Sequence, residues 1–406
     1  MISVGIDVSK EKSTICIMKP GGEILATPYD MLHTIENVNR LANRILAFDE
    51  ETRVVLEATG HYHRPVADRL MENGIFVCCV NALRMKNFCS QNLRRAKTDK
   101  IDSIKIASYG ITYWSELQPM QFVEETYQAL RLYSRQHYRY LSLLVQAKVN
   151  LCNLLDQAMP GIQRVLVDQC GKHKLTDFVS RYWHFSHITT MGQAKFCADC
   201  CKWAKKGGYR VNERQAQELY ALAQNGIPVL PCNSPTKIIV SEAVRALREL
   251  EESRDTILAY MRQLASSLPE YSVVRAMNGI GESLAPCLIA EIGDVRRFRT
   301  HGALVAYAGI DAPPYQSGSF NATNRNISKR GNKYLRKFGF EVMQVLARVK
   351  PTEDPVYLFI QKKELEGKSK NVAKIAGLNK FLRIYYARVN EVYRLADEQL
   401  IFGSSI

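Results

Sequence analysis

The sequence predicts a mixed α/β domain at the N-terminus and a mostly α-helical remainder. The first eighty or so residues alternate short apolar runs, turn residues and helical periodicity, which is typical of a sheet covered by helices. Two later stretches keep helical spacing over many turns without an internal glycine or proline. With 406 residues, 46% of them hydrophobic, the chain can bury the cores of two or three domains.

The N-terminal elements follow one another in an informative order. A short apolar strand over residues 2–9 opens the chain, and a second apolar run that ends at Glu57 reads as a later strand. Three antiparallel strands followed by alternating helix and strand is the order of the ribonuclease-H-like fold, in the variant resembling Holliday-junction resolvases of the RuvC type. The expected strands are 2–9, 13–18, 23–26, 53–57 and 75–80, and the expected helices are 34–48, 63–73 and the segment around 99–102.

Four carboxylates stand where a metal site would need them. Asp7 lies inside a strand that looks buried, and an unpaired charge is expensive to desolvate, so it requires a partner. Glu57 ends another strand, and Asp99 and Asp102 are spaced to share one face of a helix that Thr98 could cap. Four hard oxygen ligands suit Mg²⁺ in phosphoryl transfer. Taken singly, each of these acids reads more simply as solvated surface.

The charge balance favours a polyanionic partner. The formal net charge is +15 and the sequence pI is about 9.3, and neutralised phosphates release counterions that drive binding. Nucleic acid is therefore the leading partner, although charge alone does not exclude a membrane surface. We expect no membrane span and no signal peptide, and hence a cytoplasmic, nucleoid-associated bacterial protein whose 11 cysteines are reduced thiols.

The middle of the chain is predicted to contain two long helices that act as spacers between the terminal domains. Long helices are expected over 124–159 and 235–268, forming an antiparallel coiled-coil arm or a dimer interface. The residues between them look irregular, and the Cys-rich segment 170–232 receives no role. The sequence thus predicts three regions: a catalytic domain, a helical coiled-coil or linker region with an irregular insert, and an α-helical C-terminal domain, over 1–115, 116–270 and 271–406.

The C-terminal region contains two further signals. Gly279-Ile280-Gly281 between expected helices resembles a helix-hairpin-helix, whose turn amides can hold a DNA phosphate. A loop of small residues and turn formers over 306–319 contains Ser317 and Ser319, and a run of cations without an acid follows it over 323–340. A serine in such a loop is usually a turn residue, but before so basic a segment it could be a nucleophile towards a phosphodiester.

Together these motifs resemble the DEDD transposases of bacterial insertion sequences, a group that includes Piv-type DNA invertases and recombinases guided by a bridge RNA. The resemblance covers nearly the whole chain. It rests on Gly5-Ile6-Asp7-Val8-Ser9-Lys10, Glu57-Ala58-Thr59-Gly60, Lys97-Thr98-Asp99-Lys100-Ile101-Asp102, Gly279-Ile280-Gly281, Gly309-Ile310 and Ser317-Gly318.

The resemblance implies a role for each of these acids. Asp7, Glu57, Asp99 and Asp102 would form a RuvC-like tetrad that binds Mg²⁺, with Mn²⁺ as the alternative. Ser317 would attack DNA and form a phosphoserine link, with Ser319 as the rival. The implied partners are donor and target DNA, a structured guide RNA and further copies of the chain in a dimer or tetramer.

Three hypotheses follow from the sequence. The first is a site-specific DNA transposase or recombinase. The second is a RuvC-like, metal-dependent, structure-specific nuclease that hydrolyses its substrate, with Ser317 structural. The third is a non-catalytic nucleic-acid-binding protein whose carboxylates are surface residues.

Overall fold

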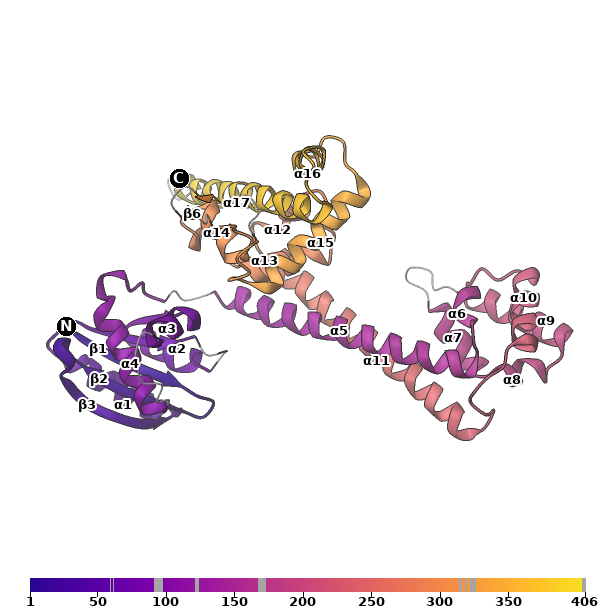
Figure 1. The fold of residues 1–406 in the computed structure, drawn as a ribbon, viewed down its shortest axis with the longest axis horizontal. Helices are drawn as coiled ribbons and strands as arrows, with labels where there is room; N and C mark the ends of the chain where they lie inside the picture. Colours follow the sequence, from indigo (N-terminus) through magenta and orange to yellow (C-terminus); the bar gives the residue numbers. More distant parts are fainter. Residues whose placement is uncertain are drawn as a thin grey trace. The chain divides into compact units, whose positions relative to one another are not determined.

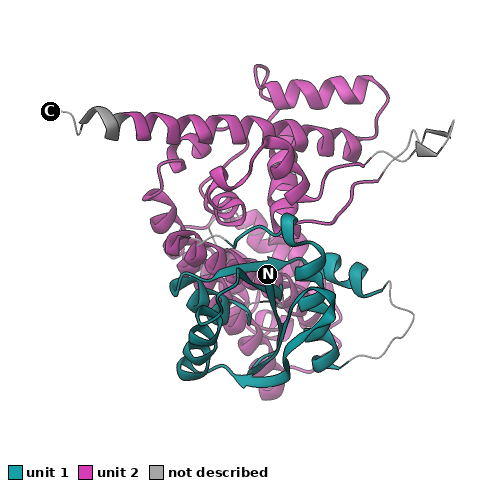
Figure 2. Cartoon of the chain, turned by 90° about the vertical axis from the view of Figure 1, so that its left-hand side faces the viewer, with its two compact units in different colours: residues 1–123 teal, residues 124–406 magenta. Residues whose placement is uncertain are grey.

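The computed structural model of the chain describes residues 1–58, 60, 62–90, 98–120, 124–166, 173–313, 316–317, 320–321 and 326–403. It divides into two compact units, Met1–Val123 and Glu124–Ile406, drawn teal and magenta in Figure 2. The division expected from the sequence, at 115 and 270, stays a prediction. None of the helices in the described ranges combines the length and the apolar character that a membrane crossing needs.

The first unit is built on a five-stranded mixed sheet. The strand order is β3-β2-β1-β4-β5, in which β1, β2 and β3 pair antiparallel and β4 and β5 extend the sheet parallel to β1 (Figure 1). This confirms the ribonuclease-H-like order expected from the sequence. The elements are β1 (Ile2–Val8), β2 (Lys12–Met18), β3 (Ile24–Leu32), α1 (Ile35–Leu46), β4 (Thr52–Glu57), α2 (Arg64–Glu72), β5 (Phe76–Val80), α3 (Ala82–Cys89) and α4 (Asp99–Thr112).

The two faces of β1 differ in chemistry because successive side chains point to opposite sides of a strand. Ile2, Val4, Ile6 and Val8 are all buried in one core, which they share with the apolar residues of α1 and α2. The alternate residues, among them Gly5, face the other side, where α4 lies. The strand is therefore buried on both faces, but only one of them is apolar.

Helix α4 rests directly on β1. A Cβ atom added to Gly5 would lie 2.3 Å from the backbone nitrogen of Ala107 and 2.4 Å from the backbone oxygen of Ser103. A Cβ atom added to Gly110 would lie 2.2 Å from the hydroxyl of Ser3. Later residues of α4 thus lie over earlier residues of β1. The helix runs antiparallel to the strand, and its first turn lies towards the carboxyl end of β1.

The second unit contains an arm of two long antiparallel helices, α5 (Glu125–Ala158) and α11 (Ser234–Ser266), which pack along each other (Figure 1). Tyr133 stacks on Tyr260 with ring centroids 6.2 Å apart, and Lys148 pairs with Glu251 at 3.5 Å. Both expected long helices are confirmed. A coiled-coil seam in the strict sense stays a prediction.

The expectation of an irregular segment between these helices is wrong. Residues 162–166 and 173–225 form a helical lobe around a core of their own, to which side chains of α5 and α11 also contribute. The helices are short and separated by loops, so none of them shows hydrophobic periodicity over many turns. Buried cysteines also fill core positions, and a cysteine is a weaker sequence signal for a core than a leucine or isoleucine. They are α6 (Ile162–Val165), α7 (Lys174–Arg181), α8 (Phe185–Thr189), α9 (Gln193–Lys206) and α10 (Glu213–Asn225).

The C-terminal helices join the arm through a buried acid. Glu270 is 1% exposed and accepts hydrogen bonds from Tyr127 of α5 at 2.6 Å and from Tyr393 of α17 at 2.7 Å. Two hydroxyl donors satisfy the carboxyl group that burial would otherwise penalise. The remaining elements are α12 (Tyr271–Arg275), α13 (Leu284–Ile292), α14 (His301–Ala308), β6 (Gln316–Ser317), β7 (Phe320–Asn321), α15 (Lys333–Val349), α16 (Pro355–Leu365) and α17 (Lys370–Gly403).

We expect Gly5→Ala to loosen the contact between β1 and α4. The new methyl group would meet helix backbone, which cannot rotate away, and overpacking of this kind costs about 1–3 kcal/mol. Amide hydrogen exchange in β1 and α4 should become faster. Gly302→Ala in α14 is the control, because its Cβ atom would meet nothing nearer than the Thr300 hydroxyl at 3.5 Å. Unchanged protection of β1 in Gly5→Ala would contradict the close contact.

Candidate active site

Asp7 and Glu57 lie near the carboxyl ends of neighbouring parallel strands, at the same edge of the sheet. The register pairs Gly5 with Val55 and Ile6 with Leu56, so Asp7 and Glu57 are the next residues along β1 and β4. Both are partly buried. A Cβ atom on Gly110 of α4 would meet Val55 at 2.8 Å, so Val55 faces α4. Since side chains alternate, Asp7 and Glu57 face α4 as well.

Asp99 and Asp102 occupy the first turn of α4. Thr98 caps the helix as expected, because its hydroxyl oxygen accepts a hydrogen bond from the Ile101 amide at 3.3 Å. Asp99 is exposed, whereas Asp102 is partly buried and pairs with Lys105 at 3.4 Å. Acids in a first helical turn also suit the positive end of the helix dipole.

The two aspartates of α4 act on different titratable groups. Burial raises the pKa of the Cys89 thiol, Lys105 lowers it, and the charges of Asp102 and Glu57 raise it further. Asp102 and Glu57 therefore act on one thiol at the end of α3.

The charge of Asp99 acts on the opposite side of β1. The pKa of Lys12 is raised by its hydrogen bond to Asp30, and Asp99 adds to that effect. The charge of Asp102 thus acts on a thiol at the end of α3, and the charge of Asp99 acts on a lysine of β2. The ends of β1 and β4 and the first turn of α4, which carry the four expected acids, lie at the same end of the sheet.

The side chains as they stand do not form a coordination shell. Within the described ranges of the chain, no group of three or more His, Cys, Asp or Glu side chains is arranged so that it could hold a metal ion. Asp102 is turned to Lys105, as given above. The donor chemistry fits a hard divalent cation, since these are all carboxylates on three fixed elements. Ligation itself stays a prediction.

Two residues near this edge were not singled out from the sequence. Asp30 of β3 accepts a hydrogen bond from the Thr14 hydroxyl at 2.8 Å, and Thr14 lies opposite Asp7 in the pairing of β1 with β2. Asp30 is thus a further carboxylate in the row that crosses the sheet through Thr14 and Asp7. Cys89 is the second. Only the strand register could have pointed to Asp30, and nothing in the local sequence points to Cys89.

Ser317, the expected nucleophile, lies in the short strand β6. It pairs with Phe320 of β7, and Gln316 pairs with Asn321. The structure describes the backbone of Ser317 but not its side chain, and Ser319 lies outside the described residues. The choice between the two serines stays a prediction.

The described residues on either side of the segment that carries these serines lie close together. A Cβ atom on Gly331 would lie 2.5 Å from the Gly309 nitrogen. The two backbone segments therefore approach each other so closely that only glycine fits. Beside this approach, the Lys329 amide donates to the Gly309 oxygen at 3.0 Å, and the Ser328 amide donates to the Asp311 oxygen at 2.8 Å. The two ends of the segment are therefore held together.

A surface of alternating cations and aromatic rings lies on α5 and α15. The Arg135 guanidinium is 5.0 Å from the centre of the Tyr334 ring, and the Lys337 ammonium is 4.6 Å from the centre of the Tyr138 ring. The two rings meet edge to face at 5.3 Å. Lys337 also pairs with an acid, Glu341, at 2.8 Å. Such cation–aromatic surfaces are typical of nucleic-acid binding.

Two family models match most of the described elements. The transposase model for the DEDD domain of the IS110 group matches residues 4–160, and the model of the transposase IS116/IS110/IS902 family matches residues 271–358. The chain belongs to this transposase family. Its enzyme class, a DNA transposase or recombinase, follows from the family, and the DEDD domain implies dependence on a divalent metal.

Curated relatives agree with the family at low identity. The chain is 28% identical over 148 residues to a probable family 20 transposase of Pseudomonas aeruginosa, a match that covers 35% of this chain and 44% of the relative's length. It is 21% identical over 357 residues to the uncharacterized 44.8 kDa protein of insertion element IS116 of Streptomyces clavuligerus, over 87% of this chain and 86% of that protein.

Two solved structures of RuvC from Thermus thermophilus also match. One is RuvC by itself, with TM-score 0.24, 16% identity, and coverage of 30% of this chain and 100% of that chain. The other is RuvC in complex with a Holliday junction substrate, with TM-score 0.23, 14% identity, and coverage of 30% and 99%.

We expect Asp102→Asn and Glu57→Gln each to make Cys89 more reactive at a given pH. A thiol reacts as the thiolate, and loss of a nearby negative charge lowers the pKa of the thiol. The midpoint of the pH profile of alkylation, followed for the Cys89 peptide by mass spectrometry, should move to lower pH. Asp49→Asn, which removes an exposed acid beyond α1, is the control and should not move it. Equal pH profiles of alkylation for all variants would show that the charges of Asp102 and Glu57 do not act on the Cys89 thiol.

Proposed function

We propose that the chain cuts and rejoins DNA strands with a divalent cation bound by Asp7, Glu57, Asp99 and Asp102 and with Ser317 as the nucleophile. The observation that carries this proposal is the meeting of two parallel strand ends with the first turn of α4, all on one face of the sheet. Backbone contacts hold each of these elements against its neighbour. A site on rigid elements is suited to precise positioning of a phosphate.

The chemistry would follow from these groups. A bound cation would stabilise the charge that builds on the oxygens of the scissile phosphate. The Ser317 hydroxyl would attack phosphorus in line, so that a serine oxygen–phosphorus bond forms and the bond to the leaving 3′ oxygen breaks. The serine gives up its proton, and the 3′ oxygen takes one up. The phosphoserine bond keeps the energy of the phosphodiester, so strands could be exchanged and resealed without ATP.

The proposed partners are donor and target DNA, a structured guide RNA and further copies of the chain in a dimer or tetramer. The cation–aromatic surface on α5 and α15 supports a nucleic-acid partner, and the paired helices α5 and α11 would supply a coiled-coil contact between copies. Gly279–Gly281 would bind a DNA phosphate as a helix-hairpin-helix turn. It connects α12 to α13, and Gly279 has a φ of 82°. Mg²⁺ is the proposed cation, with Mn²⁺ as the alternative.

We expect Ser317→Ala to abolish the covalent adduct between protein and DNA. Cognate DNA would be incubated with the protein and Mg²⁺, denatured and analysed for protein attached to DNA. Ser319→Ala is the matched control and should keep the adduct. Full strand exchange by Ser317→Ala would make the serine assignment wrong. If cleavage persists without any adduct in the unaltered protein, the chain is a hydrolytic nuclease of the RuvC type.

We expect Asp7→Asn and Asp102→Asn to lower DNA cleavage by at least about a hundredfold while DNA binding is kept. Loss of one ligand weakens the cation that stabilises the transition state, and groups of this kind contribute about 10²–10³ in rate. Asp49→Asn, remote from the site, should cleave normally. Unchanged DNA cleavage by Asp7→Asn would show that the four carboxylates do not bind a catalytic cation.

A further inference from the structure

The last two helices of the chain pack against each other beyond the C-terminal family model. That model ends at residue 358, whereas α16 continues to Leu365 and α17 starts at Lys370. The helices approach closely, because a Cβ atom added to Gly377 of α17 would lie 2.5 Å from the Ile360 side chain of α16. Neither an expected metal ligand nor the proposed serine lies on them, so the active site gives this pair of helices no role.

A groove of about 640 Å³ lies between α16 and α17. Its volume falls within the range of about 300–1,000 Å³ that is typical of ligand sites. The lining joins apolar surface to polar and cationic groups, and includes Phe359, Ala376, Asn379, Lys380, Arg383 and Ile384. The groove can therefore contact a ligand that is flat and apolar in one part and negatively charged in another.

Two cations of α17 are held at this groove without an acid. The Lys380 ammonium is 5.0 Å from the centre of the Phe359 ring. The Arg383 side chain is exposed, and its Nε donates to the Asn379 side-chain oxygen at 2.9 Å. Within the described part of the chain, the other guanidinium N–H groups of Arg383 make no hydrogen bond. The guanidinium is thus oriented by its own helix and keeps donors for an anion.

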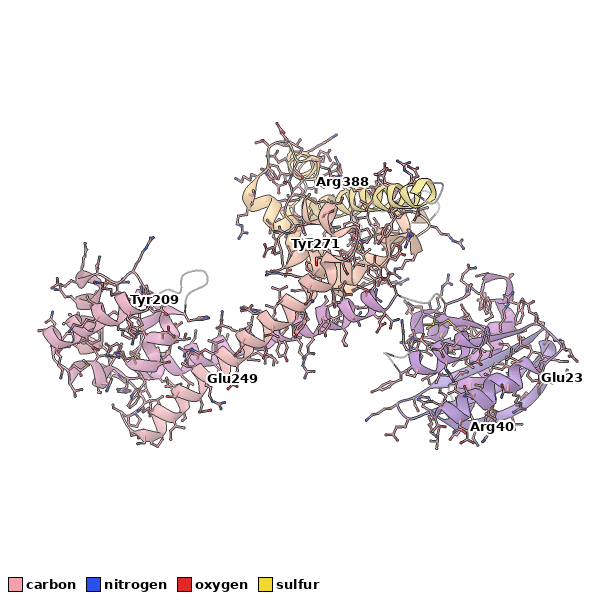
Figure 3. All side chains as sticks on the ribbon, turned by 180° about the vertical axis from the view of Figure 1, so that it is seen from behind. Glu23, Arg40, Tyr209, Glu249, Tyr271 and Arg388 are labelled. Carbon is pink, nitrogen blue, oxygen red and sulfur yellow. The ribbon has the colours of Figure 1, made fainter. Side chains whose placement is uncertain are left out.

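The sequence around the groove contains cations only. From residue 367 to residue 390 there are six Lys or Arg and no Asp or Glu. One of the six, Arg388, is labelled on α17 in Figure 3. The groove therefore lies in a stretch of α17 whose positive charge is not balanced within the stretch itself.

The acids on either side of this stretch do not neutralise the groove. Glu366 pairs with Lys363 at 2.6 Å, and Glu391 pairs with Arg394 at 2.6 Å. Asp354 accepts hydrogen bonds from backbone amides at the start of α16. The two remaining acids near these helices are exposed, and within the described ranges neither of them forms an ion pair with a cation of the groove: Glu353 and Glu364.

We propose that the groove between α16 and α17 binds an unpaired base of a single-stranded nucleic acid, with Lys380 and Arg383 on the phosphates beside that base. Grooves for single strands combine an aromatic surface for the bases with cations for the backbone. A reaction that cuts and rejoins strands also exposes unpaired bases. The inference deepens the proposed function, on which it rests for the nucleic-acid partner.

Charge separates this occupant from a second copy of the chain. The chain has a formal net charge of +15, so a second copy would bring like charge to an already cationic groove. An acidic peptide would match the cations but has no series of flat rings spaced between its charges. DNA and RNA share the chemistry of the proposal, and the experiment separates them.

The test measures binding by the full-length chain without a divalent metal, so that no cleavage occurs. The probes are fluorescent single strands of DNA and of RNA with one sequence, and a DNA strand of equal length with abasic central positions. For Phe359→Ala we expect binding of the base-containing strand to weaken at least about fivefold, since a base stacked on an aromatic ring contributes about that much or more. Binding of the abasic strand should change by less than about twofold.

Leu358→Ala is the matched control for Phe359→Ala. Leu358 is the neighbouring apolar residue of α16, is 46% exposed and does not line the groove. This variant should bind every strand as the unaltered chain does. A loss by Phe359→Ala with only one of the DNA and RNA strands assigns the groove to that nucleic acid.

A second variant does not depend on the half-buried Phe359 ring. For Lys380→Gln/Arg383→Gln we expect the slope of log K against log salt to fall by about one to one and a half for base-containing and abasic strands alike, since each phosphate contact on a single strand contributes about 0.7. Lys362→Gln/Lys368→Gln removes the same charge from exposed lysines outside the groove and should change the slope less.

Three results would overturn the proposal. The first is an equal loss by Phe359→Ala with the base-containing and the abasic strand, and the second is an unchanged salt slope in Lys380→Gln/Arg383→Gln. The third is an oligoglutamate peptide that displaces the strand and itself loses affinity equally in Phe359→Ala, which would assign the groove to acidic peptides. Because the assay needs neither the carboxylates nor Ser317, its failure is distinguishable from failure of the proposed function.

Discussion

The close contact between the α4 backbone and β1 at Gly5 is the constraint on which the rest of the site depends. Helix and strand approach so nearly that there is no room for a methyl group. This contact fixes the height of the first turn of α4 over the end of β1. The pairing of β1 with β4 then fixes Glu57 beside Asp7. Three elements are thus joined by backbone geometry, and the position of each carboxylate follows from its place on an element rather than from a long flexible loop.

The same contact explains why one face of the sheet can carry acids. The apolar face of β1 is covered by α1 and α2 and supplies the main core of the first unit. On the other face, the small residues Ser3 and Gly5 let α4 approach, and Asp7 and Glu57 lie at the carboxyl ends of their strands, where both are partly buried. Stability and chemistry are therefore divided between the two sides of one strand, as alternation along a strand allows.

Much of the first unit could be predicted from local sequence. Alternation identified the strands, and Thr98 with the spacing of Asp99 and Asp102 identified the start of α4. The role of Gly5 could not be predicted, because it depends on Ser103 and Ala107, about a hundred residues later. The helices of the lobe between α5 and α11 could not be predicted for a related reason. Its short helices are stabilised by a shared core rather than by their own periodicity.

The sequence pattern identifies the four acids but does not show whether their side chains form one metal site. The structure brings the elements that carry the four acids to one edge, but it leaves the side chains outside a coordinating arrangement. Titration with Mn²⁺ followed by electron paramagnetic resonance tests the central claim most directly. We expect the unaltered chain to bind the ion at a site that both Asp7→Asn and Asp102→Asn weaken at least about tenfold. Equal binding by these variants and the unaltered chain would contradict a shared site.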